Sequence, residues 1–471
     1  MGPAVARDNA LGSIAVRPFK QFVGGGLAVS LASCGAPAAT QAPKPSISFT
    51  ILPGSGDTVT VEGEFVGVDD VFPELATLTP EPPPRGCANR CRLRYTVAPR
   101  AVIAREIPQE SQTVLLPFGH LLAFPRAPVG TPVTVTVAPE TPLRCALPSR
   151  PFPVEKGYET GFCLFGPQEA TALEKPSEYV TLHAPPGRLT PAKTAWASHA
   201  LEGVSRFYQG PMIRPERAEK LDLFLWTTGR RRGGGDAVLF GEVHSLAGAS
   251  VALYLRDDLE PSGDDWVLPH ELVHLRMPSL PADGRALMEG VATFYEPQIR
   301  CASGDLEEAV LYRHLAQGLR RGADALRQDR QNDSRGWGDI GSLYWGGAAL
   351  VARLDEEVRQ MGKLSSFREV LAADHSRGHD ATEFNTTPQL LERWSSYAGS
   401  DLRQVYETFA QGAQGKHATV ALSMTPFLTR FGLREDGTVM DESPRARGAR
   451  MTLCPRGPRD AAPGKFAGGH E

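Results

Sequence analysis

Residues 265–280 read DWVLPHELVHLRMPSL and contain the motif on which the fold prediction rests. His270 and His274 stand four positions apart, with Glu271 directly after the first histidine. On an α-helix, positions four apart lie on one face, so both imidazoles can reach a single metal ion. Glu271 then lies about a quarter turn away, where it can reach a metal-bound water without ligating the metal. The motif therefore predicts a helix with a zinc site.

The flanks of the motif indicate that this helix is buried. Apolar side chains surround the two histidines, and Pro278 and Pro281 end the helix downstream. An alternative is that both histidines are buried polar groups that are hydrogen-bonded to their neighbours. A third protein ligand would favour the metal, because catalytic zinc usually has three protein ligands and an open fourth position.

A third ligand is available in RALMEGVATFYEP, residues 285–297. The apolar pattern of this segment predicts a second helix, with Asp283 as its N-cap. Two glutamates on this helix are candidates for the third ligand, Glu289 and, two turns later, Glu296.

The order of these motifs resembles that of the gluzincin metallopeptidases, in which H-E-x-x-H is followed on the next helix by a glutamate in a segment such as N-E-G-F-A-T-Y. The corresponding segment here, residues 288–295, reads MEGVATFY. The later segment SLYWGGA, residues 342–348, resembles the Y-x-K-G-A helix of the same enzymes, although Gly346 replaces the frequent lysine. The continuation LDEEVRQ, residues 354–360, is most similar to the glycyl-aminopeptidase-like branch.

This resemblance implies a zinc metallopeptidase, a hydrolase whose substrate is a peptide or protein. It implies one Zn²⁺ per chain, a glutamate that acts as general base and a tyrosine that hydrogen-bonds the tetrahedral intermediate. The implied metal ligands are His270, His274 and Glu289, and the implied catalytic residues are Glu271 and Tyr344.

The resemblance leaves some properties open. The G-A-M-E-N segment of related aminopeptidases, whose glutamate binds the substrate's free amine, has no clear counterpart, and Asp236 or Glu242 is nearest by position. The choice between exopeptidase and endopeptidase therefore stays open. Two alternatives also remain: a catalytically inactive, peptide-binding or scaffolding surface lipoprotein that keeps the zinc fold, and a zinc hydrolase that acts on a non-peptide bond.

The fold class predicted for the whole chain is α+β. Short alternating segments between Pro and Gly turns predict an N-terminal antiparallel β-sandwich over residues 47–183, including a strand at YVTLHAP, residues 179–185. The resemblance implies a thermolysin-like catalytic domain over residues 188–440, with a small mixed sheet beside a helical lobe. The tail, residues 441–471, is expected to be partly disordered, with a possible strand at RMTLC, residues 450–454.

Local signals mark several elements of the catalytic domain. Thr190 and Pro191 predict the start of a helix that ends before Gly210. KLDLFLWTT, residues 220–228, and SVALYLRDD, residues 250–258, read as strands on either side of a Gly/Arg loop that extends to Glu242.

The N-terminal region has the pattern of a secretory signal. A basic stretch precedes an apolar run that is too short to cross a bilayer, and Leu31-Ala32-Ser33-Cys34 resembles a bacterial lipobox. The expected organisation is a signal peptide over residues 1–34, lipidation of Cys34 and a flexible tether over residues 35–46. The expected location is the cell envelope, as an outer-membrane lipoprotein that faces the periplasm or the exterior and binds the lipid bilayer through its anchor.

The six remaining cysteines suit an oxidising compartment, where up to three disulfides can form. Pairing of neighbours is the preferred arrangement, with zinc binding by the first pair as a weaker alternative. The predicted disulfides are Cys87–Cys91, Cys145–Cys163 and Cys301–Cys454.

The composition excludes one class of partner. The formal net charge is −4, and 22% of residues are charged against 41% hydrophobic, as in ordinary globular proteins. Because the chain has no overall excess of basic residues, nucleic acid is not expected as a partner.

Overall fold

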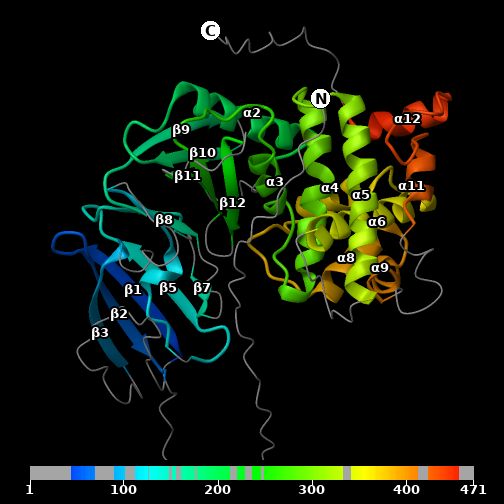
Figure 1. Cartoon of the computed structure of the whole chain (residues 1–471). Helices are drawn as coiled ribbons and strands as arrows, with labels where there is room; N and C mark the ends of the chain where they lie inside the picture. The colour runs from blue at the N-terminus through cyan, green and yellow to red at the C-terminus, as the bar shows by residue number, and fades with distance from the viewer. Residues whose placement is uncertain are drawn as a thin grey trace, which may run out of the picture. The chain divides into compact units, whose positions relative to one another are not determined.

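The computed structural model is a mixed α+β chain whose described part contains three sheets and a helical region (Figure 1). It describes residues 44–68, 90–100, 112–125, 127–147, 151–154, 161–175, 178–212, 220–228, 236–245, 249–331, 341–411 and 423–455. The predicted signal peptide, Cys34 and Cys87 lie outside these residues. Within the described part, no helix combines the length and the apolar character needed to cross a bilayer.

The N-terminal sheet has five strands in the order β3-β2-β1-β5-β7. Its strands are β1 (Ser46–Pro53), β2 (Val59–Val66), β3 (Arg90–Val97), β5 (Pro132–Val137) and β7 (Phe152–Pro153). The sheet is not purely antiparallel as predicted, because β1 and β5 pair in parallel. Alternation along a strand shows which residues are buried but not the direction of its neighbour.

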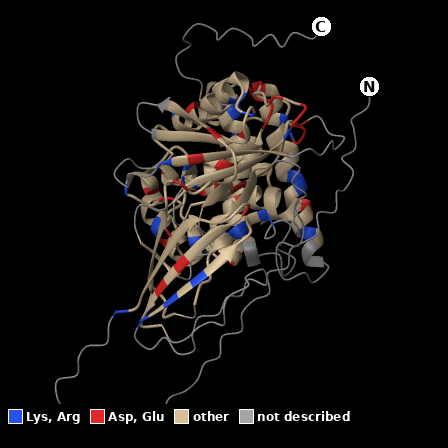
Figure 2. Cartoon of the chain, turned by 90° about the vertical axis from the view of Figure 1, so that its left-hand side faces the viewer, with Lys and Arg blue, Asp and Glu red and all other residues tan. Residues whose placement is uncertain are grey.

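One face of the N-terminal sheet is charged. Arg90, Arg92 and Arg94 on β3 pair with Glu62 and Glu64 on β2, and these strands carry the red and blue segments in the lower part of Figure 2. The residues between them, such as Leu93, are buried on the other face. This alternation of exposed and buried residues is the pattern on which the strand predictions for this region rest.

A three-stranded sheet lies between two cores. Its strands are β4 (Val114–Pro117), β6 (Leu143–Cys145) and β8 (Phe162–Phe165), and a short 3₁₀ turn, η1 (Phe118–Leu121), follows β4. On β8, Cys163 and Phe165 join the core of the N-terminal sheet, whereas Phe162 and Leu164 pack against Phe224 and Trp226 of the next sheet. Both faces are buried, so the strand is apolar throughout. The predicted Cys145–Cys163 disulfide joins paired positions of β6 and β8.

The central sheet has the strand order β12-β13-β11-β10-β9. Its strands are β9 (Glu169–Lys175), β10 (Glu178–Ala184), β11 (Leu221–Thr228), β12 (Val238–His244) and β13 (Ser250–Arg256). The predicted strands at 220–228 and 250–258 are confirmed as β11 and β13, but β12 occupies part of the predicted loop. The strand predicted at 179–185 pairs with β11, in this sheet and not in the N-terminal one.

Helices cover one face of the central sheet and continue beside it as a helical lobe (Figure 1). They are α2 (Pro191–Tyr208), α3 (Val267–His274), α4 (Arg285–Ser303), α5 (Glu308–Gln331), α6 (Gly347–Met361), α7 (Phe367–Ser376), α8 (Thr387–Ala398), α9 (Leu402–Gln411), α11 (Thr425–Arg430) and α12 (Pro444–Leu453). A 3₁₀ turn, η4 (Ala282–Gly284), precedes α4, and a π-helical turn, η5 (Ser342–Gly346), precedes α6.

Local signals set two of the helix ends as follows. Thr190 caps α2 through its side chain, which accepts a hydrogen bond from the Lys193 backbone, as its position before Pro191 predicts. The predicted strand at 450–454 is wrong, because these residues end α12. That helix begins at Ser443, whose side chain accepts a hydrogen bond from the Ala446 backbone.

The Cys301–Cys454 disulfide is present and ties the end of α4 to the end of α12. Cys91 is also disulfide-bonded, and its predicted partner, Cys87, lies outside the described residues.

Candidate metal centre

Helix α3 carries the two motif histidines as predicted. It runs from Val267 to His274, and all eight of its residues are buried. Pro269 stands in the first turn, where the missing N–H removes no helical hydrogen bond. The imidazole rings of His270 and His274 lie 5.1 Å apart between centroids, which places both nitrogens on one face of the helix.

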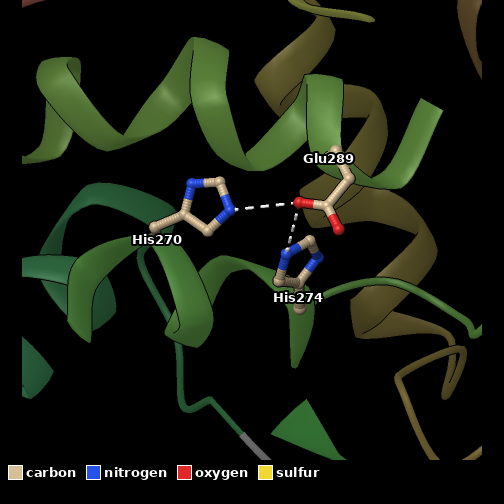
Figure 3. Close-up of side chains that lie close together, drawn as sticks. All are labelled: His270, His274 and Glu289. Carbon is tan, nitrogen blue, oxygen red and sulfur yellow. Dashed lines mark hydrogen bonds and ion pairs between the residues drawn. The ribbon is translucent and has the colours of Figure 1, made fainter. Parts of the chain in front are cut away.

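Helix α4 brings Glu289 to these histidines (Figure 3). Its Oε2 atom lies 3.3 Å from Nε2 of His270 and 3.6 Å from Nε2 of His274. One potential ligand atom from each of the three residues falls within 4.8 Å of the other two. Helices that are separated by a Pro-rich turn thus converge on one point.

This donor set fits Zn²⁺. Zinc binds imidazole nitrogen and carboxylate oxygen at about 2.0–2.2 Å with tetrahedral geometry, which places ligand atoms roughly 3.3 Å apart. The two measured N···O distances, 3.3 and 3.6 Å, are close to that separation. The Nδ1 atom of His274 is buried and has no hydrogen-bond partner among the described residues. Within the described residues, no protein group therefore fixes the orientation of the His274 ring through its Nδ1 atom.

The charges in the cluster are unequal. Burial would raise the pKa of Glu289, but its contacts with His270 and His274 outweigh this effect and lower the pKa. Burial lowers the pKa of His270. At His274 burial also lowers the pKa, but the contact with Glu289 and the charge of Glu271 together outweigh it and raise the pKa of that ring. Glu289 is therefore ionised at neutral pH, the form in which a carboxylate binds a metal.

Glu271 differs from Glu289 in its environment. It is buried on α3, and burial, together with the charges of Glu289 and Glu242, raises its pKa to about 7. A carboxylate with a pKa near the working pH can both accept and return a proton.

Gly241 allows Glu271 to lie against the edge strand of the central sheet. A Cβ atom at position 241 would stand 2.5 Å from Cγ of Glu271 and 2.8 Å from Cγ1 of Val267. Any larger residue would therefore push β12 away from α3. Glu242, the next residue, has a side chain that is 42% exposed and pairs with Nε2 of His244 at 3.0 Å.

A close crossing of α4 and α6 places Tyr344 near the cluster. A Cβ atom on Gly290 would lie 2.2 Å from the carbonyl carbon of Gly347, so only glycine fits at this crossing. Gly290 and Gly347 are the two glycines of the motifs that carry the family resemblance. Their contact explains why a residue next to Glu289 and a residue near Tyr344 are both small.

Tyr344 stands in the π-helical turn η5, a distortion that occurs frequently at functional sites. Its ring stacks on His270 with centroids 5.6 Å apart and an interplanar angle of 26°. Burial and the charges of Glu289 and Glu271 raise the pKa of its phenol. The hydroxyl therefore stays protonated at neutral pH and can donate a hydrogen bond.

The remaining site predictions divide as follows. Glu296 does not reach the histidines; it pairs with Arg300 at 3.1 Å. Two residues were candidates for the amine-binding position. The charge of Glu242 raises the pKa of Glu271, whereas the charge of Asp236 raises the pKa of Asp265 and of Arg256. Asp283 does not cap α4, because η4 precedes the helix and Gly284 occupies the N-cap position.

Two residues at the centre escaped the sequence prediction. The Trp266 ring makes a T-shaped contact with His270, with centroids 5.5 Å apart, and is 42% exposed. Arg285 lies 3.7 Å from Glu289. Each stands four positions before a predicted ligand, so helical periodicity was the signal that could have found both.

Comparison with known proteins places the fold. An aminopeptidase N family protein from Idiomarina loihiensis matches with a TM-score of 0.51 and 13% identity, over 82% of this chain and 78% of that chain. An M1 zinc metallopeptidase from Deinococcus radiodurans matches with a TM-score of 0.45 and 14% identity, over 79% and 94% of the two chains. The first likeness shows a shared fold, and its low identity limits it to the fold. No protein-family model and no curated sequence matches the chain.

Proposed function

We propose that this protein is a zinc-dependent peptidase. The observation that carries the proposal is the convergence of His270, His274 and Glu289 beside a buried glutamate and a protonated tyrosine. The fold shared with an aminopeptidase N family protein supports it. The motif residues that resemble those of the gluzincins are the same ones that meet in space.

The residues have separate roles in this proposal. His270, His274 and Glu289 would hold Zn²⁺, which, when bound, supplies a Lewis acid that polarises a carbonyl and lowers the pKa of a coordinated water. Glu271 accepts the proton of the attacking water and donates it to the leaving amine. Tyr344 donates a hydrogen bond to the developing oxyanion, a contact typically worth about 3–4 kcal/mol in the transition state.

A peptide library tests this function. The full chain is loaded with zinc and incubated with the library, with and without a chelator, and cleavage sites are mapped by mass spectrometry. We expect cleavage that the chelator abolishes. Glu271→Gln should retain zinc and lose roughly 10²–10⁴-fold in rate, because it removes the proton acceptor but no ligand.

Two outcomes would overturn parts of the proposal. Cleavage by Glu271→Gln at the wild-type rate would remove Glu271 as the general base. A wild-type protein that holds zinc and binds library peptides without cleaving them would instead be an inactive peptide-binding or scaffolding protein. The positions of the cleavage sites also distinguish an exopeptidase from an endopeptidase.

We also propose that the chain is exported and lipid-anchored through Cys34 at the cell envelope. Two disulfides in the described part support an oxidising compartment. Mass spectrometry of the N-terminal peptide from a membrane fraction tests the anchor. We expect a lipid-modified Cys34, and a mature N-terminus at any other residue would contradict the proposal.

A further inference from the structure

Arg285 lies at the metal centre on the side away from the histidines. It is the first residue of α4, one turn before Glu289. Oε2 of Glu289 faces the two imidazoles, whereas its other oxygen, Oε1, lies 3.7 Å from Nε of Arg285. The Arg285 side chain is 64% exposed, against 13% for Glu289. A cation thus stands at the solvent side of the cluster.

Helix stability does not explain this arginine. The N-terminus of a helix is the positive end of its dipole, where acidic residues are favoured and a cation is unfavourable. The first turn of α4 contains no acidic residue, and the acidic residue of the preceding turn η4 is Asp283, two positions before Arg285. The order of the pair is also the weaker one, because a glutamate before a basic residue stabilises a helix better than the reverse. A residue that breaks local rules in this way is expected at functional sites.

The contact with Glu289 does not explain it either. The separation of 3.7 Å is longer than a hydrogen bond, which usually spans 2.7–3.2 Å. Guanidinium has five N–H donors in a planar fork that fits a carboxylate with two parallel bonds. The charge of Arg285 also lowers the pKa of His274 and of Tyr344, so it lies within electrostatic range of both groups.

We propose that Arg285 binds a carboxylate of the peptide substrate beside the bond that is cleaved. This inference rests on the proposed peptidase function and adds its substrate class, peptides with an acidic group near the cleavage site. Two sources share this chemistry, the C-terminal α-carboxylate of a short peptide and the side chain of an internal Asp or Glu.

Binding measurements on the full, zinc-loaded chain with Glu271→Gln test the proposal, since this variant should hold peptides without cleaving them. The probes are tetra-alanine as the free acid, tetra-alanine amide, and amidated tetra-alanines with one Glu or one Gln at each position in turn. Isothermal titration calorimetry gives each Kd. We expect a carboxylate peptide to bind about tenfold more tightly than its neutral counterpart.

Adding Arg285→Gln should abolish this preference, and Arg285→Lys should restore part of it, because lysine keeps the charge without the planar fork. Arg403→Gln is the matched control. Arg403 also stands in the first turn of its helix, α9, pairs with a glutamate four residues later at 2.8 Å, and is 52% exposed. The control should keep the full preference. Zinc content and thermal unfolding check that each variant retains the metal and the fold.

The pair of probes that differs in Kd identifies which carboxylate is bound. A difference between the free acid and the amide indicates the C-terminal α-carboxylate, and a difference between the Glu and the Gln peptide indicates a side chain. Equal binding of acidic and neutral peptides, no binding of any probe, or a preference that survives Arg285→Gln would overturn the proposal. Cleavage of library peptides with no such preference would refute the role of Arg285 alone. An Arg285-dependent preference without cleavage would refute the peptidase function alone.

Discussion

Two buried glutamates on α4 show how partners decide the behaviour of a carboxylate. Glu289, near the start of the helix, faces two imidazoles, and its pKa falls. Glu296, two turns later, faces the single guanidinium of Arg300 at 3.1 Å. Burial raises the pKa of Glu296 to about 7, because the contact with Arg300 offsets burial only in part.

The two halves of α4 therefore have different tasks. The first half presents an ionised carboxylate to the two histidines of the candidate metal centre, and the second half holds a carboxylate that is protonated below neutral pH. Burial raises the pKa of both carboxylates, so it does not explain why their pKa values differ. The number and geometry of the neighbouring basic side chains separate them, since two imidazoles contact Glu289 and one guanidinium contacts Glu296. These neighbours come from other turns and other helices.

Removing each carboxylate gives the largest contrast. Glu289→Gln should lose most bound zinc and at least about 10³-fold in peptide hydrolysis, because it removes one of three ligands. Glu296→Gln should keep both zinc and activity. Zinc content after dialysis and initial rates with a library-derived peptide measure the difference. Full zinc occupancy in Glu289→Gln would exclude Glu289 as a ligand.

Opening the disulfide beside the second half of α4 should affect stability. The Cys301–Cys454 bridge spans 153 residues, and the chain-entropy relation for such a loop gives about 5 kcal/mol. Cys301→Ser with Cys454→Ser should therefore lower the denaturant midpoint while leaving zinc binding in place below that midpoint. The Cys145–Cys163 bridge closes a loop of only 18 residues, so replacing both of these cysteines by serine should cost less. Equal losses from both pairs would refute the loop-length account.

Tyr344→Phe should leave the metal centre intact and lower kcat by roughly 10²–10³-fold, the usual effect of losing one oxyanion donor. Zinc content should not change, since the ring contact with His270 is kept. Steady-state rates with the peptide used for Glu289→Gln make the two variants comparable. A change in KM with kcat unaltered would assign Tyr344 to substrate binding and not to transition-state stabilisation.

The parts that the sequence predicts well are those set within one element. His270 and His274 share a face because their spacing matches the helical period, and α3 has that geometry. Glu289 lies on another helix, so its proximity to them was predictable only through the resemblance to a family. The close contact of Gly290 with Gly347 provides the physical reason for that part of the pattern.

Relations between distant segments account for the errors. Alternation at 179–185 predicts a strand but not that it pairs with β11. Strand β12 was missed because the loop predicted from the Arg/Gly run before it was extended to Glu242, past Gly241. That glycine, Gly241, is instead required by the approach of Glu271. Residues 450–454 have a composition typical of a strand but end a helix. The N-cap signal of that helix, Ser443 before a proline, stands seven residues before Arg450.

The smallest expected effect concerns the pH dependence of stability at Glu296. Its pKa of about 7 in the folded protein exceeds the ordinary value of 4.5, so the folded state holds this proton more tightly than the unfolded chain. Stability should therefore fall as the pH rises from 4.5 to 7, by about 3 kcal/mol at 1.36 kcal/mol per pKa unit. Glu296→Gln cannot ionise and should not lose this stability.

Urea unfolding of the zinc-loaded wild type and of Glu296→Gln at pH 5 and pH 8 tests this effect, because other titrating groups cancel in the difference. Between pH 5 and pH 8, the free energy of unfolding of the variant should increase by about 2–3 kcal/mol relative to that of the wild type. The opposite sign, a variant that becomes relatively weaker at pH 8, would mean that Glu296 and Arg300 form a stabilising buried ion pair. In that case the contacts with basic side chains would outweigh burial at both carboxylates, and both would be ionised at neutral pH. Glu289 and Glu296 would then differ only in whether they bind the metal.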